Sequence, residues 1–551
     1  MVSLPLGALL ALALVAPLGA AEHFACDCAA GADPSCVPGD DGAAGTTPAS
    51  AWRTYDRAQD QWASLAAGDA IRFCRGGVFP ITGSTQWVNG SCTALAPCVL
   101  ADYAPAWGSG DEPRPRLEQS AGNGLDLREP PPVEPESGYR IAALELACTA
   151  CDAGHWGVVI GNDVDDVELA DLEIHGFDIG VHLTGSGACG PAAGCDARNS
   201  RVTLRDSLVR DNGSQGWLGA GDALVLAGNR FVGNGGGTVF EHNVYLSQSG
   251  GATTGIQVVG NELHRSARDS DGRCVGGSFA MHGEHQDVLI ADNWVHEDIG
   301  LAWPTCWGIG VTPSYASPEG FTRVTVRGNR LENLGNIALA LASCVDCVVE
   351  NNLVVQHQDH GTLGIAAPAV TRALDDAALA ALVVRNNSIF IGAAGGTGIR
   401  LGGEGEGHQL VSNALQTTAT ASWACFDADL SPAAYALADH NVCGYPPGPF
   451  REWELGSGSL AAWQAASGHD ASSLAADPGF AAPAPPLHDL RAASPAAAMV
   501  DAGHPTASAP TDVDGAPRGA DPDAGAHELA PCLFCDGFES GDLGAWSGSQ
   551  P

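Results

Sequence analysis

The chain has 551 residues, of which 64 are acidic and 25 basic, so its formal net charge is −39. Every basic residue is an arginine. This acidity excludes nucleic acid as a natural ligand, because the phosphate backbone would be repelled. The 72 glycines and the low aromatic content indicate a turn-rich β protein rather than a disordered chain.

Residues 1–21 read as a secretory signal peptide. The stretch MVSLPLGALLALALVAPLGAA has an apolar core and small residues before Glu22. No other stretch reaches about 18 apolar residues, which predicts a mature chain without a membrane span. The 18 cysteines agree with export to an oxidising compartment. We expect a secreted monomer, extracellular or at the cell surface, with the periplasm as an alternative.

Residues 22–140 are expected to form a disulfide-rich N-terminal cap and the first coils of a repeat region. The segment AWRTYDRAQDQWASL at 51–65 has helical character, and AAGDAIRFCRGGVF at 66–79 reads as a turn followed by a strand. The open end of a repeat fold exposes apolar interior and unpaired backbone. A helix at this end would cover it.

A phrase with an asparagine at its centre recurs within residues 141–445. It reads apolar-x-apolar-x-x-Asn-x-apolar, and successive centres lie 22 to 36 residues apart. Its central asparagines are Asn229, Asn261, Asn293, Asn329, Asn352, Asn387 and Asn413. Two earlier copies carry Leu172 and Ser207 instead. Repeats of this length are typical of solenoids, and the irregular period indicates loop insertions.

Each repeat contains three short strands. The apolar alternation on both sides of the asparagine predicts strand, tight bend and strand. A third strand closes the coils, as IGVHL at 179–183, NVYL at 243–246, FAMHG at 279–283, GIGV at 308–311, IALAL at 337–341 and GIRL at 398–401. Three strands per coil predict an all-β fold, the parallel β-helix. Each asparagine would face inward and bond to that of the next coil, because a buried amide needs partners.

The repeats are followed by two further segments. Residues 446–530 are rich in Ala and Pro and are expected to be an irregular C-terminal capping region. Residues 531–551 are a tail too short to fold alone.

One disulfide follows from the repeat geometry. Cys274 lies 13 residues after Asn261, and Cys306 lies 13 residues after Asn293, so the two occupy matching loops of adjacent coils. Other pairs rest on proximity alone, namely Cys148–Cys151, Cys189–Cys195, Cys344–Cys347, Cys425–Cys443 and Cys532–Cys535. The alternative for the CxxC pairs is zinc or redox chemistry, which the absence of matching histidines disfavours.

Several phrases resemble those of a known superfamily. They are AAGDAIRFCRGGVF near the N-terminus, the asparagine-centred repeats, SLAADPGF at 473–480, HDLRAASPA at 488–496 and TDVDGAPRGADPDAGAHE at 511–528. Together they look like secreted bacterial right-handed parallel β-helix repeat proteins of the pectate-lyase-like superfamily. The resemblance implies a right-handed β-helix. It leaves the activity open, because the superfamily includes polysaccharide lyases, hydrolases, epimerases and proteins with no known reaction.

The longest coil insertions locate the candidate site. They are RSARDSDGRCVGG at 265–277 and TPSYASPEGF at 312–321, and both would lie over neighbouring coils. The phrases EHNVYLSQS at 241–249 and SFAMHGEHQD at 278–287 flank them and form the third strands of successive coils.

Five residues are candidates for catalysis. Strand alternation turns Tyr245 and His282 outward on one face, with Glu284 nearby. An ionised tyrosine or a neutral histidine is a competent base if its pKa is tuned by burial or positive charge. Arg265 and Arg273 would supply that charge and neutralise a substrate carboxylate.

The candidate substrate-binding residues are His242, His264, His296, Trp303 and Trp307. His264 and His296 stand at the same offset after consecutive central asparagines. The tryptophans would supply stacking faces for sugars.

Three functions compete for this site. A lyase on an acidic, uronate-containing polysaccharide needs a base and a group that neutralises the carboxylate, and it is the favoured hypothesis. The absence of lysine excludes the versions that use a lysine base. A glycoside hydrolase needs paired carboxylates, for which Asp269, Asp271 and Glu284 are nearest. The third alternative is a non-catalytic glycan-binding or cell-surface protein.

Calcium is the one cofactor considered, and no metal ligands are assigned. NDVDD at 162–166 and DVDG at 512–515 are rich in oxygen ligands, but neither matches an EF-hand loop. Solvated acidic turns are the favoured interpretation of both.

Overall fold

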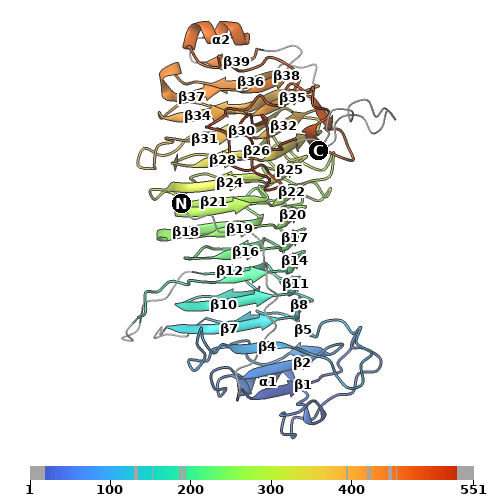
Figure 1. Ribbon diagram of the computed structural model, residues 1–551. Coiled ribbons are helices and arrows are strands. Elements are labelled where there is room, and N and C mark those ends of the chain that lie inside the picture. The colour runs from blue at the N-terminus through green and yellow to red at the C-terminus, as the bar shows by residue number, and fades with distance from the viewer. Residues whose placement is uncertain are drawn as a thin grey trace, which may run out of the picture.

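The protein is an elongated rod of strands stacked in chain order, with the N-terminal coils (blue) at one end and later coils (orange) at the other (Figure 1). The computed structural model describes residues 19–529 except 129–134, 152, 185–188, 190–193, 393–394, 419–422, 445–448 and 454–455. Most of the expected signal peptide, the C-terminal tail and the Cys532–Cys535 pair lie outside the described residues. No helix in the described part of the chain is long and apolar enough to cross a membrane.

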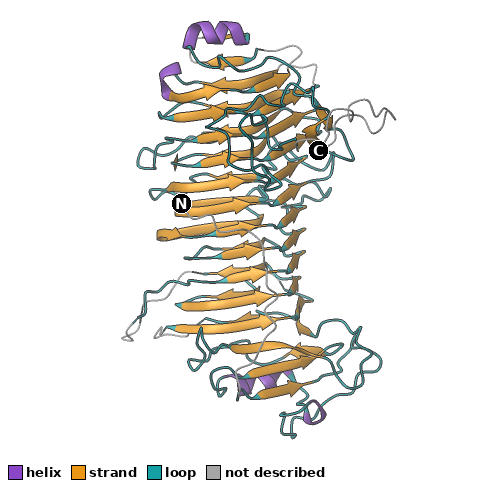
Figure 2. Cartoon of the chain, viewed as in Figure 1, coloured by secondary structure: helices purple, strands orange, loops and turns teal. Residues whose placement is uncertain are grey.

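Each coil contributes strands to three faces, and the strands of successive coils pair in parallel (Figure 2). The first face contains β1 (Glu22–Ala25), β2 (Ala70–Cys74), β4 (Cys98–Tyr103), β7 (Glu136–Ala142), β10 (Val164–Ala170), β13 (Thr203–Arg205), β16 (Val225–Ala227), β19 (Gln257–Val259), β24 (Gly320–Arg327), β27 (Cys344–Val345), β28 (Val348–Glu350), β31 (Val383–Arg385), β34 (His408–Val411) and β37 (Tyr435–Asp439).

The second face is a separate sheet. It contains β3 (Val78–Ile81), β5 (Arg116–Gln119), β8 (Glu145–Cys148), β11 (Glu173–His175), β14 (Leu208–Arg210), β17 (Arg230–Val232), β20 (Glu262–His264), β22 (Trp294–His296), β25 (Arg330–Glu332), β29 (Leu353–Gln356), β32 (Ser388–Ile391), β35 (Ala414–Thr417) and β38 (Val442–Gly444).

The third face contains β6 (Leu125–Asp126), β9 (Trp156–Ile160), β12 (Ile179–Leu183), β15 (Gln215–Leu218), β18 (His242–Thr254), β21 (Phe279–Ala291), β23 (Ile309–Val311), β26 (Ile337–Leu341), β30 (Thr362–Ala367), β33 (Gly396–Leu401), β36 (Trp423–Ala428) and β39 (Arg451–Trp453). The long strands β18 and β21 continue past the corner into the first face of the next coil. The predicted right-handed parallel β-helix, with its third strands, is confirmed.

The predicted asparagine ladder runs through the interior. The side-chain amide of each of the seven asparagines donates to the amide oxygen of the next at 2.9 to 3.0 Å. Each of them is at most 2% exposed. The ladder includes Asn441, which the repeat phrase missed because Ala436 and Ala438 replace its larger apolar residues. At the other end Ser207 accepts the N–H of Leu172 through its hydroxyl, at 3.0 Å.

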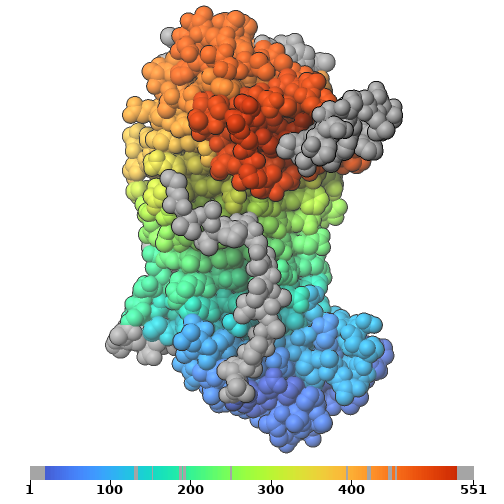
Figure 3. All heavy atoms as spheres, viewed as in Figure 1, coloured from blue at the N-terminus to red at the C-terminus, as the bar shows by residue number. Residues whose placement is uncertain are grey.

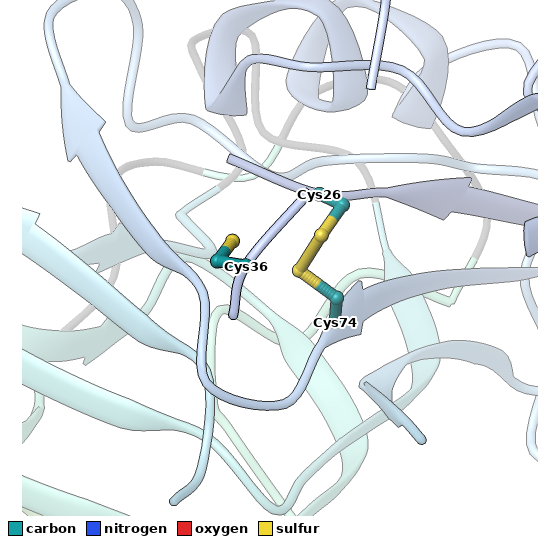
Figure 4. A group of neighbouring side chains, drawn as sticks. All are labelled: Cys26, Cys36 and Cys74. Carbon is teal, nitrogen blue, oxygen red and sulfur yellow. A yellow bond between two sulfur atoms is a disulfide. The ribbon is translucent and has the colours of Figure 1, made fainter. Parts of the chain in front are cut away.

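The N-terminal end is covered as expected. Helix α1 (Tyr55–Trp62) lies across the first coils and buries Tyr55, Ala58 and Trp62. Three disulfides fasten the same region, namely Cys26–Cys74, Cys28–Cys36 and Cys92–Cys98. Figure 4 shows the first of them, with Cys36 beside it.

The C-terminal region covers the other end and then one side. Helix α2 (Leu460–Ser467) buries Trp463 over the last coil, after β40 (Gly456–Gly458), which pairs antiparallel with β39. The chain then folds back along the second face, with a hairpin of β41 (Phe480–Ala482) and β42 (Asp489–Ala492) (Figure 3). Apolar residues of both parts form one small core, namely Val355, Phe390, Ala414, Val442, Phe480, Leu490, Met499 and Ala524.

The predicted Cys274–Cys306 disulfide is confirmed, with a Cα–Cα distance of 5.4 Å. The proximity pairs within the described residues are also confirmed, namely Cys148–Cys151, Cys189–Cys195, Cys344–Cys347 and Cys425–Cys443. No cysteine in the described part of the chain is free, so the zinc alternative for these cysteines is wrong.

Candidate active site

The third face is hollowed beside Tyr245. The matching positions on the two following strands of this face are Ala280 and Gly310, which carry almost no side chain. Tyr245 points outward because its neighbours Val244 and Leu246 are fully buried. A pocket of about 410 Å³ opens there, which we call the third-face pocket. It is lined by Val239, Phe240, His242, Tyr245, Gly277, Phe279, Ala280, His282, Thr305, Trp307, Gly310, Thr312 and Ser314.

His282 enters this pocket with one ring nitrogen already occupied. Its Nδ1 is hydrogen bonded to the carbonyl oxygen of Thr312. Because a carbonyl can only accept, Nδ1 carries the proton of the neutral ring and Nε2 remains an acceptor. Burial lowers the pKa of His282, an effect that the Thr312 bond and Glu319 partly offset. The ring is therefore a neutral imidazole near pH 7.

The backbone after His282 turns in a way that requires glycine. Gly283 has a φ of +116°, and a Cβ at this position would lie 2.2 Å from the carbonyl oxygen of Gln248 on β18. Its N–H donates to the Glu319 carboxylate at 2.5 Å. Gly283 thus lets the two long strands approach each other where His282 is placed.

Tyr245 is paired with a tyrosine from the 312–321 insertion. The hydroxyl oxygens of Tyr245 and Tyr315 lie 2.9 Å apart. The His282 ring makes edge contacts with both, at centroid distances of 5.4 and 5.7 Å. Burial, followed by the Tyr315 hydrogen bond, raises the pKa of Tyr245. The hydroxyl therefore stays protonated, and the hypothesis of an ionised tyrosine base loses its physical basis.

Glu319 holds the insertion over the pocket. It is 2% exposed, and its carboxylate accepts the N–H groups of Ser314, at 2.5 Å, and of Tyr315. Its own N–H donates to Asp376 at 2.8 Å. The sequence indicated an insertion here, but neither Tyr315 nor this buried glutamate was identified from it.

A second pocket of about 320 Å³ lies on the same face toward the N-terminal end. It is lined by His182, Leu183, Thr184, Ala197, Arg198, Asn199, Leu218, Ala220, Gly221, Ser247, Gln248 and Tyr315. Tyr315 therefore borders this pocket while its hydroxyl contacts Tyr245. Arg198 lies 3.5 Å from Asp222 and donates to the carbonyl of Ala252 at 2.7 Å. Sequence reasoning missed this pocket.

No protein-family model matches the sequence, and no curated protein matches it. Solved structures are similar only distantly. An alginate lyase from Paenibacillus sp. str. FPU-7 has 15% identity and a TM-score of 0.38, over 59% of this chain and 97% of that one. Pectate lyase Pel9A has 10% identity and a TM-score of 0.41, over 92% and 96%. A GH136 lacto-N-biosidase from Eubacterium ramulus has 11% identity and a TM-score of 0.39, over 79% and 68%. These likenesses concern the fold and carry nothing about the site.

The structure brings four of the predicted site residues together. Tyr245, His282, His242 and Trp307 all line the third-face pocket. His242 is nearly buried and its Nδ1 donates to the Gly277 carbonyl at 2.7 Å. Its ring contacts that of Tyr245 at a centroid distance of 5.0 Å.

The two predicted arginines do not line the pocket. Arg265 pairs with Asp298 at 3.1 Å. Arg273 pairs with Asp271 at 2.6 Å and lies over the Trp303 ring at 4.3 Å. Asp298 of the next coil holds Arg265, and Asp271 of the same loop holds Arg273, so the expected placement of these arginines over Tyr245 and His282 is wrong.

The remaining predicted residues also lie elsewhere. Glu284 is exposed on β21, beyond the Gly283 turn, and does not line the pocket. His264 and His296 stand on β20 and β22 of the second face, where their rings stack at 4.1 Å. Trp303 is 42% exposed and donates to Asp269 at 2.9 Å. The common spacing after the central asparagines correctly placed the two histidines on one face, but it could not show that the pocket lies on a different face.

Several carboxylates of the acidic turns considered for calcium have partners within the protein. Asp165 and Asp166 both pair with Arg201, at 2.8 and 2.6 Å. In the second turn Asp512 accepts the N–H of Ala516 at 2.8 Å. The buried Oδ2 of Asp163 in the first turn makes no hydrogen bond with any described residue, and calcium stays a prediction that the function proposed below does not use.

Proposed function

We propose that this chain is a secreted carbohydrate-active β-helix protein, a lyase that cleaves an acidic polysaccharide in the third-face pocket. The observation that carries the proposal is the pairing of His282 with Tyr245. His282 offers an unprotonated Nε2, and Tyr245 keeps its proton. A base and an acid of this kind are what β-elimination of a uronate requires.

In the proposed reaction His282 Nε2 removes the proton from the carbon beside the substrate carboxylate. The electron pair forms a carbon–carbon double bond as the glycosidic C–O bond breaks. The Tyr245 hydroxyl gives its proton to the departing oxygen, and the hydrogen bond between Tyr245 and Tyr315 can return one. His282 then releases its extra proton to solvent, and Tyr245 regains one from solvent, which restores both side chains.

The substrate carboxylate needs a positive partner, because elimination places negative charge on it. None of the residues that line the third-face pocket is an arginine. Arg198 lines the neighbouring pocket, which shares Tyr315, and we assign it this role. Its ion pair with Asp222 at 3.5 Å is loose enough to exchange for a substrate carboxylate.

Hydrolysis is a weaker candidate for the same pocket. Glycosidases use two carboxyl groups that flank the bond. No Asp or Glu is among the residues lining the third-face pocket, and the nearby Glu319 is occupied by backbone N–H groups.

A non-catalytic glycan-binding protein is the second candidate. The pocket offers aromatic surfaces, including Trp307 and Phe240, and the latter is 77% exposed. Aromatic faces stack on the apolar faces of sugars without any need for catalysis.

The test is incubation with alginate, pectate, glycosaminoglycans and neutral glycans, beside the His282→Ala variant as the control. The proposal expects unsaturated uronate ends, detected by their ultraviolet absorbance, from at least one acidic polymer. New reducing ends without this absorbance would replace the lyase by a hydrolase. Binding without product would support the non-catalytic alternative, and neither binding nor product would overturn the proposal.

A further inference from the structure

A cluster of histidines and carboxylates on the second face has no part in the proposed reaction. Strand β20 carries Glu262 and His264, and β22 carries His296 at the position matching His264. The intervening Leu263 and Val295 are buried in the core. Alternation therefore directs Glu262, His264 and His296 to the same outer surface.

The donor atoms of these three side chains converge. One ligand atom from each lies within 4.8 Å of the other two. The Nε2 of His296 is 3.4 Å from Oε1 of Glu262, and the His264 and His296 rings stack at 4.1 Å. Asp298 stands next to them, with an oxygen 3.7 Å from Nε2 of His264.

One of these donor atoms is buried without a hydrogen bond. Nε2 of His264 is shielded from solvent and makes no hydrogen bond. A buried ring nitrogen normally has a partner, because desolvation without one costs about 1–3 kcal/mol. An ion in front of the Nε2 edges of the two rings would satisfy it.

The chemistry of the donors selects the class of ion. Two imidazole nitrogens and one carboxylate oxygen suit Zn²⁺ and similar transition metals, whereas Ca²⁺ prefers oxygen alone. Arg230 holds the other Glu262 oxygen at 2.7 Å, so Oε1 faces Nε2 of His296, and an ion would replace the long 3.4 Å contact between them. Arg265 pairs with Asp298 at 3.1 Å. Both arginines are about half exposed, so they compete only weakly for these carboxylates.

We propose that Glu262, His264 and His296 bind one divalent transition-metal ion of the Zn²⁺ class, with Asp298 beside the fourth position. The stacked rings would rotate slightly so that both Nε2 atoms point at the ion. The ion would tie two successive coils together on the second face. The site is independent of the proposed function, which depends on the third face.

The test uses the full secreted chain without a histidine tag, stripped with a chelator and dialysed against Zn²⁺. Bound zinc is measured by elemental analysis, and Co²⁺ absorption reports the coordination. His175→Ala is the matched control, because His175 occupies the same lane on β11 and pairs with Glu145 at 3.0 Å. Its neighbours in that lane are Ala147 and Arg210, so it has no second histidine.

The proposal expects about one zinc ion per chain for the parent and for His175→Ala. His264→Ala and His296→Ala should bind it at least about tenfold more weakly, and Glu262→Gln should weaken it as well. Each metal-free variant must unfold at the same temperature as the metal-free parent. His264→Gln replaces any variant that fails to fold. No saturable binding by the parent would overturn the proposal. Equal binding by the parent and both histidine variants would also overturn it.

Discussion

Two sets of positions recur in successive coils, namely the inner bend and the outward-facing position that Tyr245 occupies on the third face. The residue type is constant in the first set and changes in the second. At the inner bend, asparagine repeats from Asn229 to Asn441, each bonded to the next. At the outward-facing position the residue changes from Tyr245 to Ala280 and Gly310 within three coils. A buried amide needs hydrogen-bond partners, which the asparagine of the next coil supplies, whereas an outward residue is free to change. The interior therefore specifies the rod, and one short stretch of its surface specifies the pocket.

Removing one amide from the asparagine ladder should have a large effect on stability. Asn352→Ala removes an acceptor from the backbone and side-chain N–H groups of Asn329, and a donor to Asn387 and Val326. Because these groups are buried, we expect the free energy of unfolding to fall by about 3–5 kcal/mol. Urea unfolding measures it. Ser207→Ala, at the end of the ladder, should cost only about 1–2 kcal/mol, and equal losses would contradict the cooperative ladder.

Disulfide bonds hold the outer loops in place, whereas the repeated asparagine hydrogen bonds hold the interior. The Cys274–Cys306 bridge closes 32 residues and lies next to Thr305 and Trp307 of the pocket wall. Replacing both cysteines by alanine should lower the free energy of unfolding by about 4 kcal/mol, because the unfolded chain gains freedom. The Cys344–Cys347 bridge closes only three residues, and its removal should cost about 2 kcal/mol. A larger loss from the short bridge would contradict this account.

Buried imidazoles should respond to acid, because they can take up a proton and the ladder amides cannot. Burial lowers the pKa of His242 and of His285 to about 4. The unfolded chain takes up protons below about pH 6.5, so their contribution is present above that pH and is lost as the pH falls toward 4. Each of the two histidines should lower the free energy of unfolding by about 3 kcal/mol over this pH range. Urea unfolding at pH 7 and at pH 4.5 measures the loss, and His285→Gln should reduce it; an unchanged loss would refute the assignment.

The pH dependence of turnover in the third-face pocket should also follow from the effect of burial on pKa. Burial lowers the pKa of His282 and raises that of Tyr245. Turnover should therefore decline only below pH 6.5, where His282 gains a proton, and stay level to about pH 9. Rates measured on one substrate from pH 4 to pH 9 test this. A decline that begins above pH 7 on the acid side would contradict a neutral His282 with a lowered pKa.

The repeat pattern was sufficient to predict the fold. Alternation and the recurring asparagine placed the strands, the inner bends and the Cys274–Cys306 bridge, because each depends only on matching positions in adjacent coils. The one missed rung, Asn441, lies where alanines weaken the apolar signal.

The candidate site was predicted only in part. Alternation correctly turned Tyr245 and His282 outward, and strand pairing brought them together. The path of an insertion depends instead on tertiary contacts, such as those of Glu319, so the position of Tyr315 could not be read from spacing. For the same reason the arginine of the second pocket was missed.

Turnover of two histidine variants decides whether the third-face pocket carries the activity. On a polysaccharide that the parent cleaves, turnover of His282→Ala is compared with that of His175→Ala, which alters a histidine on the second face. We expect at least about a hundredfold loss of turnover for His282→Ala with unchanged thermal unfolding, and a near-normal rate for His175→Ala. A near-normal rate for His282→Ala would place the activity elsewhere on the rod.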